Sequence, residues 1–180
     1  MNRTIEEKNK ELVLKGRLVR RVGLRMSISC NPGSARIEIE RTLLSEVEAI
    51  SPFVDELMLL IRKCGCVPEG ETDVEVALRE ALANAIIHGN QEHPRKRVHV
   101  ICHCEPEEVS IAVKDEGRGF DINKLADPTA PENIGAVHGR GIYLMKALMD
   151  DVRFEEGGAV VRMRKSAGQA AGKDAPRGTR

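Results

Sequence analysis

An acid and an amide stand four residues apart in the segment TDVEVALREALANAIIHGN, which covers residues 72–90. They are Glu80 and Asn84, and on a helix this spacing places their side chains next to each other on one face. A carboxylate in such a pair can accept a proton, while an amide oxygen can hold a hard cation. The pair therefore suits phosphoryl transfer from a magnesium nucleotide.

Two glycine boxes lie further along the chain, with the sequences DEGRGF at residues 115–120 and GRG at residues 139–141. The first follows a predicted strand, so we expect Asp115 at the mouth of a pocket, where Gly117 and Gly119 allow positive φ angles and a close approach of the backbone. The second precedes a predicted helix, whose N-terminal amides attract phosphate oxygens. An ordinary tight turn and a flexible hinge are the alternative interpretations of the two boxes.

Composition is compatible with one domain and with few classes of partner. A chain of 180 residues that is 41% hydrophobic can bury a single core, and with no Trp, one Tyr and three Phe that core must be aliphatic. The 28 basic and 28 acidic residues give a formal net charge of zero. We therefore expect no direct binding to nucleic acid or membrane, and partner specificity must come from local contacts.

The sequence also indicates a compartment. The N-terminal residues lack the apolar run of a signal peptide, and no later stretch approaches the roughly 18 apolar residues that suggest a membrane span. The five cysteines are an odd number in a chain without an export signal. We therefore expect a cytoplasmic protein with reduced thiols.

The segment VHVICHC, residues 98–104, has two interpretations. Its cysteines and histidines could be metal ligands, or the alternation of a strand could place Cys102 and Cys104 on one face with two valines. We favour the core strand, because the spacing in Cys64-Gly-Cys66 is also one residue short of the usual zinc knuckle.

The chain divides into three predicted parts. Residues 1–34 form a charged N-terminal arm, which is disordered or adds an edge strand through its LRMSIS segment. Residues 35–165 form the folded domain. Residues 166–180 are small, polar and aperiodic, which is typical of a flexible tail.

Periodicity predicts the order strand, helix, helix, strand, strand, helix, strand within the folded domain. The first helix is expected to end at Gly65, and Pro52 either kinks it or marks the start of its main part. The second helix is expected to begin at Thr72 with a side-chain cap. This order predicts an α/β (α+β) two-layer sandwich, with the helices on one face of a mixed, mostly antiparallel sheet.

Three segments resemble, in order, the motifs of the GHKL (histidine kinase-like) ATPase superfamily, and within it those of the anti-sigma-factor serine kinases. EALANAIIHGN is similar to the N box of that family, DEGRGFD to its first glycine box, and HGRGIYLMKALMDDV to its second glycine box and the following helix. The resemblance covers roughly residues 36–165 and implies a Bergerat-type ATP-binding fold.

The resemblance also implies a role for each matching residue. Glu80 resembles the proposed general base, Asn84 the magnesium ligand, and Asp115 the residue that accepts a hydrogen bond from the exocyclic amine of adenine. ATP and Mg²⁺ are therefore the expected cofactors, and residues 121–138 would form a lid over the triphosphate. The other expected nucleotide-binding positions are Gly117, Gly119, Gly139, Arg140 and Gly141, and either Arg118 or Arg140 could contact the γ-phosphate.

The function implied by the resemblance is that of an ATP-dependent serine/threonine protein kinase. Its expected partner is a small anti-sigma-factor antagonist; the same surface could sequester a sigma factor, and a homodimer could form through the N-terminal strand region. Two alternatives stay open: a nucleotide-regulated binding module without phosphotransfer, and a detached histidine kinase catalytic domain. A binding module does not need Glu80 as a base, and the short lid, with no phosphoacceptor helix predicted ahead of the domain, disfavours the histidine kinase.

Overall fold

The computed structural model describes residues 2–7, 12–14, 17–19, 22–31, 34–67, 69–119 and 140–167, with side chains described from residue 36 onward. Its main feature is a seven-stranded sheet in the order β1-β4-β5-β6-β7-β9-β8. The strands are β1 Asn2–Glu7, β4 Val22–Asn31, β5 Ser34–Leu44, β6 Arg97–Glu105, β7 Glu108–Asp115, β8 Asp151–Glu155 and β9 Val160–Ser166. Two short strands, β2 Leu12–Leu14 and β3 Arg17–Val19, form a separate hairpin pair.

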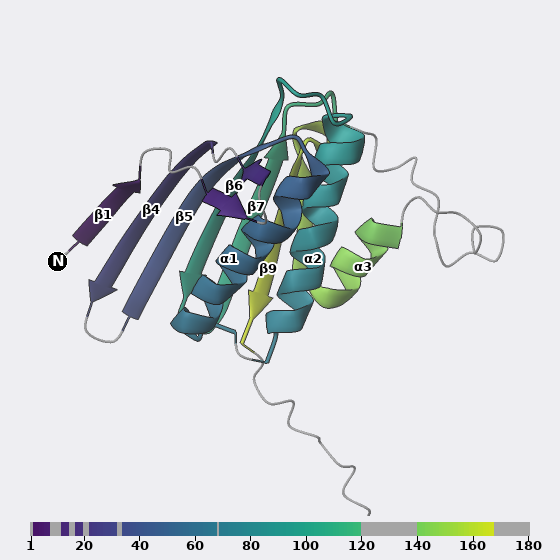
Figure 1. Cartoon of the computed structure of the whole chain (residues 1–180). Helices are drawn as coiled ribbons and strands as arrows, with labels where there is room; N and C mark the ends of the chain where they lie inside the picture. The colour runs from purple at the N-terminus through teal and green to yellow at the C-terminus, as the bar shows by residue number, and fades with distance from the viewer. Residues whose placement is uncertain are drawn as a thin grey trace, which may run out of the picture.

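Three α-helices cover one face of this sheet (Figure 1). They are α1 Ile50–Cys64, α2 Glu71–Ala83 and α3 Arg140–Leu148; a 3₁₀ turn, η1 Val47–Ala49, leads into α1, and a π-helix, η2 Asn84–Gly89, continues α2 directly. Aliphatic side chains from the helices and from the inner face of the sheet form one hydrophobic core. The predicted α+β two-layer sandwich with helices on one face is confirmed.

Every pair of neighbouring strands in the described sheet is antiparallel. The consecutive pairs β4–β5, β6–β7 and β8–β9 are joined by short connections, which only antiparallel strands can use. Between β5 and β6 the chain passes through two helices and returns in the opposite direction. The prediction that the sheet is mostly antiparallel is therefore confirmed. The prediction that it mixes parallel and antiparallel strands is wrong, since no parallel pair occurs among the described strands.

Strand β6 confirms that VHVICHC belongs to the core. Its inward side chains, including Cys102 and Cys104, are buried, while His103 on the other face is exposed. In the parts of the chain that the structure describes, no group of three or more His, Cys, Asp or Glu residues is arranged to hold a metal ion. No described helix has both the length and the apolar composition needed to cross a membrane.

The expectation of reduced thiols is wrong for two cysteines. Cys66 and Cys104 form a disulfide with their Cα atoms 6.1 Å apart, and it closes a loop with a sequence separation of 38 residues. Cys64 and Cys102 are not part of a disulfide, and burial raises the pKa of the Cys102 thiol to about 12. Counting cysteines could not reveal the pair, because the turn after α1 brings Cys66 onto β6 only in the folded chain.

The helix boundaries settle two further expectations. Helix α1 begins at Ile50, so Pro52 lies in its first turn, where the missing N–H has no helical partner to lose. Gly65 ends the helix with a φ of 65°. The predicted cap at Thr72 is wrong: α2 begins one residue earlier, with Gly70 at the N-cap and no side-chain cap. The cause is the preceding turn, in which Gly70 donates its N–H to the carbonyl of Val67.

The two edges of the sheet were the least predictable parts. The LRMSIS segment lies in β4, which pairs with β5, and β1 lies outside it. At the other edge, β8 was not predicted: in DVRFE the apolar Val152 and Phe154 alternate with charged residues over only five positions, and the strand pairs with β9 alone. The predicted lid, Gly139 and most of the predicted tail lie outside the described residues.

Candidate functional site

The acid and amide of the candidate site lie at the junction of α2 and η2. The inward positions of this segment are buried as predicted: Val74, Leu78, Ala81 and Ala85. This burial anchors the helix to the sheet and leaves Glu80 and Asn84 half-buried at the edge of the apolar stripe.

A glycine of α3 lies against this pair. A Cβ atom built on Gly141 would stand 2.5 Å from Oε2 of Glu80 and 3.6 Å from Nδ2 of Asn84. The first of these distances is too short for any side chain at residue 141 unless Glu80 moves. The predicted pair and the second glycine box, which are far apart in the sequence, therefore meet at one point.

The side-chain amide of Asn84 has a buried nitrogen, Nδ2, without a hydrogen-bond partner among the residues that the structure describes. A buried amide without a partner is destabilising by about 1–3 kcal/mol, so such groups are rare unless a ligand completes them. The amide thus fits a position that contacts a bound group.

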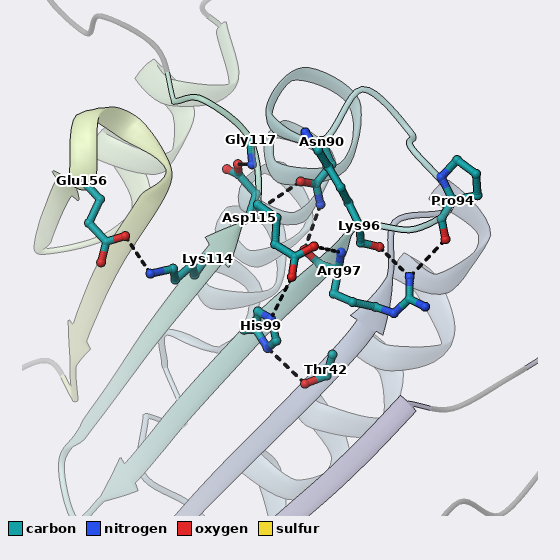
Figure 2. A network of polar contacts seen from close by, with 11 residues as sticks. Thr42, Asn90, Pro94, Lys96, Arg97, His99, Lys114, Asp115, Gly117 and Glu156 are labelled. Atoms are coloured by element: carbon teal, nitrogen blue, oxygen red, sulfur yellow. Dashed lines mark hydrogen bonds and ion pairs between the residues drawn. The ribbon is translucent and has the colours of Figure 1, made fainter.

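The second cluster surrounds Asp115, the last residue of β7, whose exposed fraction is 7%. The backbone N–H of Gly117 donates a hydrogen bond of 2.7 Å to Oδ1 of Asp115 (Figure 2). A Cβ built on Gly89 would lie 2.5 Å from Oδ2 of the same carboxylate, and one built on Gly117 would lie 2.2 Å from the carbonyl oxygen of Gly89. Main chain without side chains therefore encloses this carboxylate, which we call the Asp115 cradle (Gly89, Asp115 and Gly117).

Burial dominates the electrostatics of the Asp115 cradle. It raises the pKa of the Asp115 carboxyl above its usual range, and the hydrogen bond from Gly117 and the charge of Lys96 only partly oppose this effect. A carboxylate held in this way is poorly hydrated, so a donor that reaches it gains a stronger hydrogen bond than it would at the surface.

Gly119 has a structural reason to be glycine. Its φ is +71°, and a Cβ there would lie 2.1 Å from the carbonyl oxygen of Gly157 in η5, the 3₁₀ turn Glu156–Gly158 between β8 and β9. The residue packs the first glycine box onto that turn. Its predicted contact with a nucleotide stays a prediction.

The remaining predicted positions lie near these clusters or outside the residues that the structure describes. Arg140 is the exposed first residue of α3, and Arg118 is exposed in the first glycine box. Gly139 lies outside the described residues. Sequence reasoning missed Gly89 and Asn90, although a Gly-Asn pair at the end of a helical pattern is a recognisable signal for a helix terminus.

The π-helix η2 connects the two clusters. It begins at Asn84, beside Glu80 and Gly141, and ends at Gly89, which covers Asp115. π-Helical turns are rare and are often found at functional sites. A groove of about 770 Å³ that includes Glu108 and Lys165 lies at the opposite end of β7 and is separate from this arrangement.

Comparison with known proteins agrees with this geometry. The sequence profile of the histidine kinase-like ATPase domain matches residues 43–165. The chain is 33% identical over 145 residues to an anti-sigma F factor of Heyndrickxia coagulans, covering 76% of this chain and 85% of that protein. It is 30% identical over 146 residues to an anti-sigma F factor of Bacillus subtilis strain 168, covering 77% and 86%. It is also 31% identical over 134 residues to the serine-protein kinase RsbW of Bacillus licheniformis, covering 66% and 84%.

Proposed function

This chain belongs to the histidine kinase-like ATPase family, among its anti-sigma-factor serine kinases, and from that premise we propose that it transfers the γ-phosphate of ATP to a serine or threonine of a partner protein. The observation that carries the proposal is the arrangement along η2. An acid and an amide meet Gly141 at one end, and a buried carboxylate is enclosed by backbone at the other. This separation suits a nucleotide, whose base and terminal phosphate need different surroundings.

Asp115 is the proposed reader of the base. Its carboxylate accepts a hydrogen bond from the exocyclic amine of adenine, while Gly117 donates to its Oδ1 and fixes its orientation. Guanine presents a carbonyl where adenine carries this amine, so it would face the carboxylate with an acceptor. We therefore expect the site to prefer ATP to GTP.

Glu80 is the proposed general base. As the hydroxyl oxygen of the acceptor residue forms its bond to the γ-phosphorus, the Glu80 carboxylate takes the hydroxyl proton. The bond between the γ-phosphorus and the bridging oxygen breaks, and ADP leaves with that electron pair. Gly141 limits where the Glu80 carboxylate can lie, because its backbone occupies the adjacent space.

Asn84 is the proposed ligand of Mg²⁺. Rotation of its amide by half a turn exchanges nitrogen and oxygen, so a hard oxygen donor can occupy the buried position that now lacks a partner. Magnesium bound there would neutralise charge on the phosphates. Gly117, Gly119, Gly139, Arg140 and Gly141 are the proposed further contacts to the nucleotide.

The proposed biological setting follows the names of the relatives. We infer a small anti-sigma-factor antagonist as the phosphoacceptor and a sigma factor as a second partner, in the cytoplasm, with a role in regulating transcription. Within the chain, residues 35–165 are the proposed kinase domain, preceded by an N-terminal arm at residues 1–34 and followed by a tail at residues 166–180. A homodimer through the N-terminal strands is part of the same proposal.

The test of this function is the variant Glu80→Gln, which keeps the shape of the side chain and removes its basic site. We expect nucleotide affinity to be retained and phosphate transfer to fall by roughly a hundredfold to ten-thousandfold. The measurement is single-turnover transfer from labelled ATP to the copurified partner at equal nucleotide occupancy.

The same assay tests the alternative functions. Transfer within a few-fold of the parent would show that Glu80 is not the base. No transfer by either protein would favour a nucleotide-regulated binding module. Labelled phosphate on a histidine of the acceptor would point to a histidine kinase.

A further inference from the structure

A polar side chain lies fully buried next to the Asp115 cradle. Asn90 follows η2 directly and has an exposed fraction of 0%. Both ends of its amide are satisfied by main chain: Nδ2 donates to the carbonyl oxygen of Arg97 at 2.9 Å, and Oδ1 accepts from the backbone N–H of Glu116 at 2.9 Å (Figure 2). One side chain thus fixes two separate segments of backbone.

These two backbone groups mark the place where β6 and β7 stop pairing. The last pair of the ladder at this end is Val98 with Asp115, so Arg97 and Glu116 would form the next pair if the ladder continued. The Asn90 amide lies between them and bonds to the Arg97 carbonyl and the Glu116 N–H, the two groups of one missing peptide hydrogen bond. The N–H of Arg97 donates instead to Oε2 of Glu116 at 2.9 Å. The two strands are therefore held apart, but at a fixed separation, immediately beyond Asp115.

The backbone on both sides of this bridge forms the cradle. Gly89, which precedes Asn90, covers the Asp115 carboxylate, and Gly117, which follows Glu116, donates to its Oδ1. The N–H of Asn90 also bonds to the carbonyl of Ala85 at 2.8 Å, which ties the bridge to η2. Loss of the Asn90 side chain would therefore loosen both walls of the cradle, while the bond from the Arg97 N–H to the Glu116 carboxylate stays in place.

We propose that Asn90 is a positioning residue for the nucleotide base: its amide bridge sets the orientation of the Asp115 carboxylate and thereby the preference for adenine over guanine. This inference rests on the proposed function, in which Asp115 reads the base. Asn90 does not itself touch the nucleotide in this scheme. Its effect reaches the base through the backbone of Gly89 and Glu116.

The experiment compares the dissociation constants for ATP and GTP, each with Mg²⁺, by calorimetry on the full chain. In Asn90→Ala the bridge is lost, so we expect ATP affinity to fall by roughly tenfold, the size of one misaligned hydrogen bond to a charged acceptor. GTP affinity should change much less, so the preference for ATP, which is the dissociation constant for GTP divided by that for ATP, should fall by a similar factor. Gln91→Ala is the matched control, because Gln91 is the exposed neighbour and makes neither bond of the bridge.

A purely structural role would give a different result. If Asn90 only stabilised the fold, the variant would melt at a lower temperature with an unchanged ATP-to-GTP ratio at temperatures where it is folded, and that result would overturn the inference. Should Asn90→Ala not fold, Asn90→Ser provides the same comparison, since one hydroxyl cannot reach both backbone groups, and it should lower the ratio by a smaller factor.

Amide hydrogen exchange gives an independent readout. The N–H groups of Glu116 and Gly117 should exchange faster in either Asn90 variant, while amides at the centre of α2 should keep their protection. Unchanged exchange at Gly117 would also overturn the inference. A parent protein that binds ATP no better than GTP would instead refute the proposed role of Asp115, and the positioning role of Asn90 with it.

Discussion

Backbone lines one end of η2, and side chains line the other. At the Gly89 end, a side-chain carboxylate is enclosed by backbone that belongs to neighbouring segments of β7 and η2. At the Asn84 end, two side chains of one helix meet a backbone position of another helix, α3. Backbone enclosure gives a cradle suited to selecting a base, whereas two side chains that face the backbone of another helix suit a step in which a proton and a phosphate are transferred.

This comparison predicts that changes at the two ends separate affinity from catalysis. Changes at the Asn84 end should alter phosphate transfer or triphosphate binding. Changes at the Gly89 end should alter the binding of the base. Four substitutions or treatments test the division, beginning with the largest expected effect.

The largest effect is expected for Gly141→Ala. The new methyl group would meet Oε2 of Glu80 at 2.5 Å, and the flexible side chain would move away. A displaced base of this kind costs on the order of a hundredfold in transfer rate. ATP affinity, to which Gly141 is also proposed to contribute, should fall by a smaller factor. Single-turnover transfer and calorimetry measure the two quantities.

Lys146→Ala is the matched control for this variant, since Lys146 is exposed on the same helix. Shortening the acid in Gly141→Ala/Glu80→Asp should relieve the contact and recover part of the lost rate. Equal transfer by Gly141→Ala and the parent would remove the link between α3 and the proposed base.

The next largest effect is expected at the other end, for Asp115→Asn. The variant replaces a charged carboxylate with a neutral amide, which has one acceptor oxygen and one donor NH₂ group. The hydrogen bond from the adenine amine is weakened, so ATP affinity should fall by roughly tenfold or more. Calorimetry with adenosine should show the same loss, because the base and not the phosphates is affected. Glu92→Gln, which changes an exposed carboxylate outside the Asp115 cradle, is the control and should leave affinity close to that of the parent.

Asp115→Asn should lower ATP affinity without lowering the stability of the ligand-free fold. Burial raises the pKa of Asp115, so the folded state binds the proton more tightly than the unfolded state does. The carboxyl therefore destabilises the ligand-free fold at neutral pH, and this cost disappears as the pH falls through the raised pKa. The ligand-free variant should melt at the same temperature as the parent or higher at pH 7, and a large drop in melting temperature would show that Asp115 has a structural role.

A smaller effect is expected for Asn84→Ala. The variant loses one polar contact to the bound ion, so its affinity for magnesium ATP should fall by roughly fivefold. Its affinity for adenosine should be unchanged. Titrations with and without magnesium measure it, and Asn84→Asp, which keeps an oxygen donor, should retain the dependence on magnesium. If the parent binds ATP equally well in both conditions, Asn84 is not a metal ligand.

The smallest difference between the two ends is expected on reduction of the disulfide. The loop between Cys66 and Cys104 contains the whole of α2 and η2, so opening it should affect both ends alike. Loop-closure entropy for 38 residues corresponds to about 4 kcal/mol of folding free energy, or a melting temperature lower by roughly 10 °C. The ratio of ATP to GTP affinity should stay constant at low temperature, and Cys64→Ser, which changes a thiol outside the disulfide, is the control.

Much of the fold follows from local pattern. Alternation in VHVICHC placed its cysteines on the core face, and the three-and-four spacing of apolar residues defined α1 and the buried side of α2. The same spacing placed Glu80 and Asn84 on one helix face. These predictions hold because the periodicity of a helix or strand depends on the backbone alone, and the core must bury whichever side is apolar.

Other features could not be read from local pattern. Strand β8 was not predicted, since its alternation of Val152 and Phe154 with charged residues covers only five positions and an edge strand of this length gains its order from pairing with β9. The disulfide was also missed, because two cysteines separated by 38 residues become neighbours only when α1 packs on β6.

What the sequence by itself determined is which residues have the chemistry and which element presents each of them: an acid and an amide on a helix, a carboxylate at the end of a strand, and glycines beside them. Only the tertiary structure decided that Gly141 confines Glu80, that Gly89 covers Asp115 and that Asn90 bridges β6 and β7. The reason is physical: side-chain direction follows from local backbone geometry, whereas contacts between segments depend on how whole elements pack around a common core.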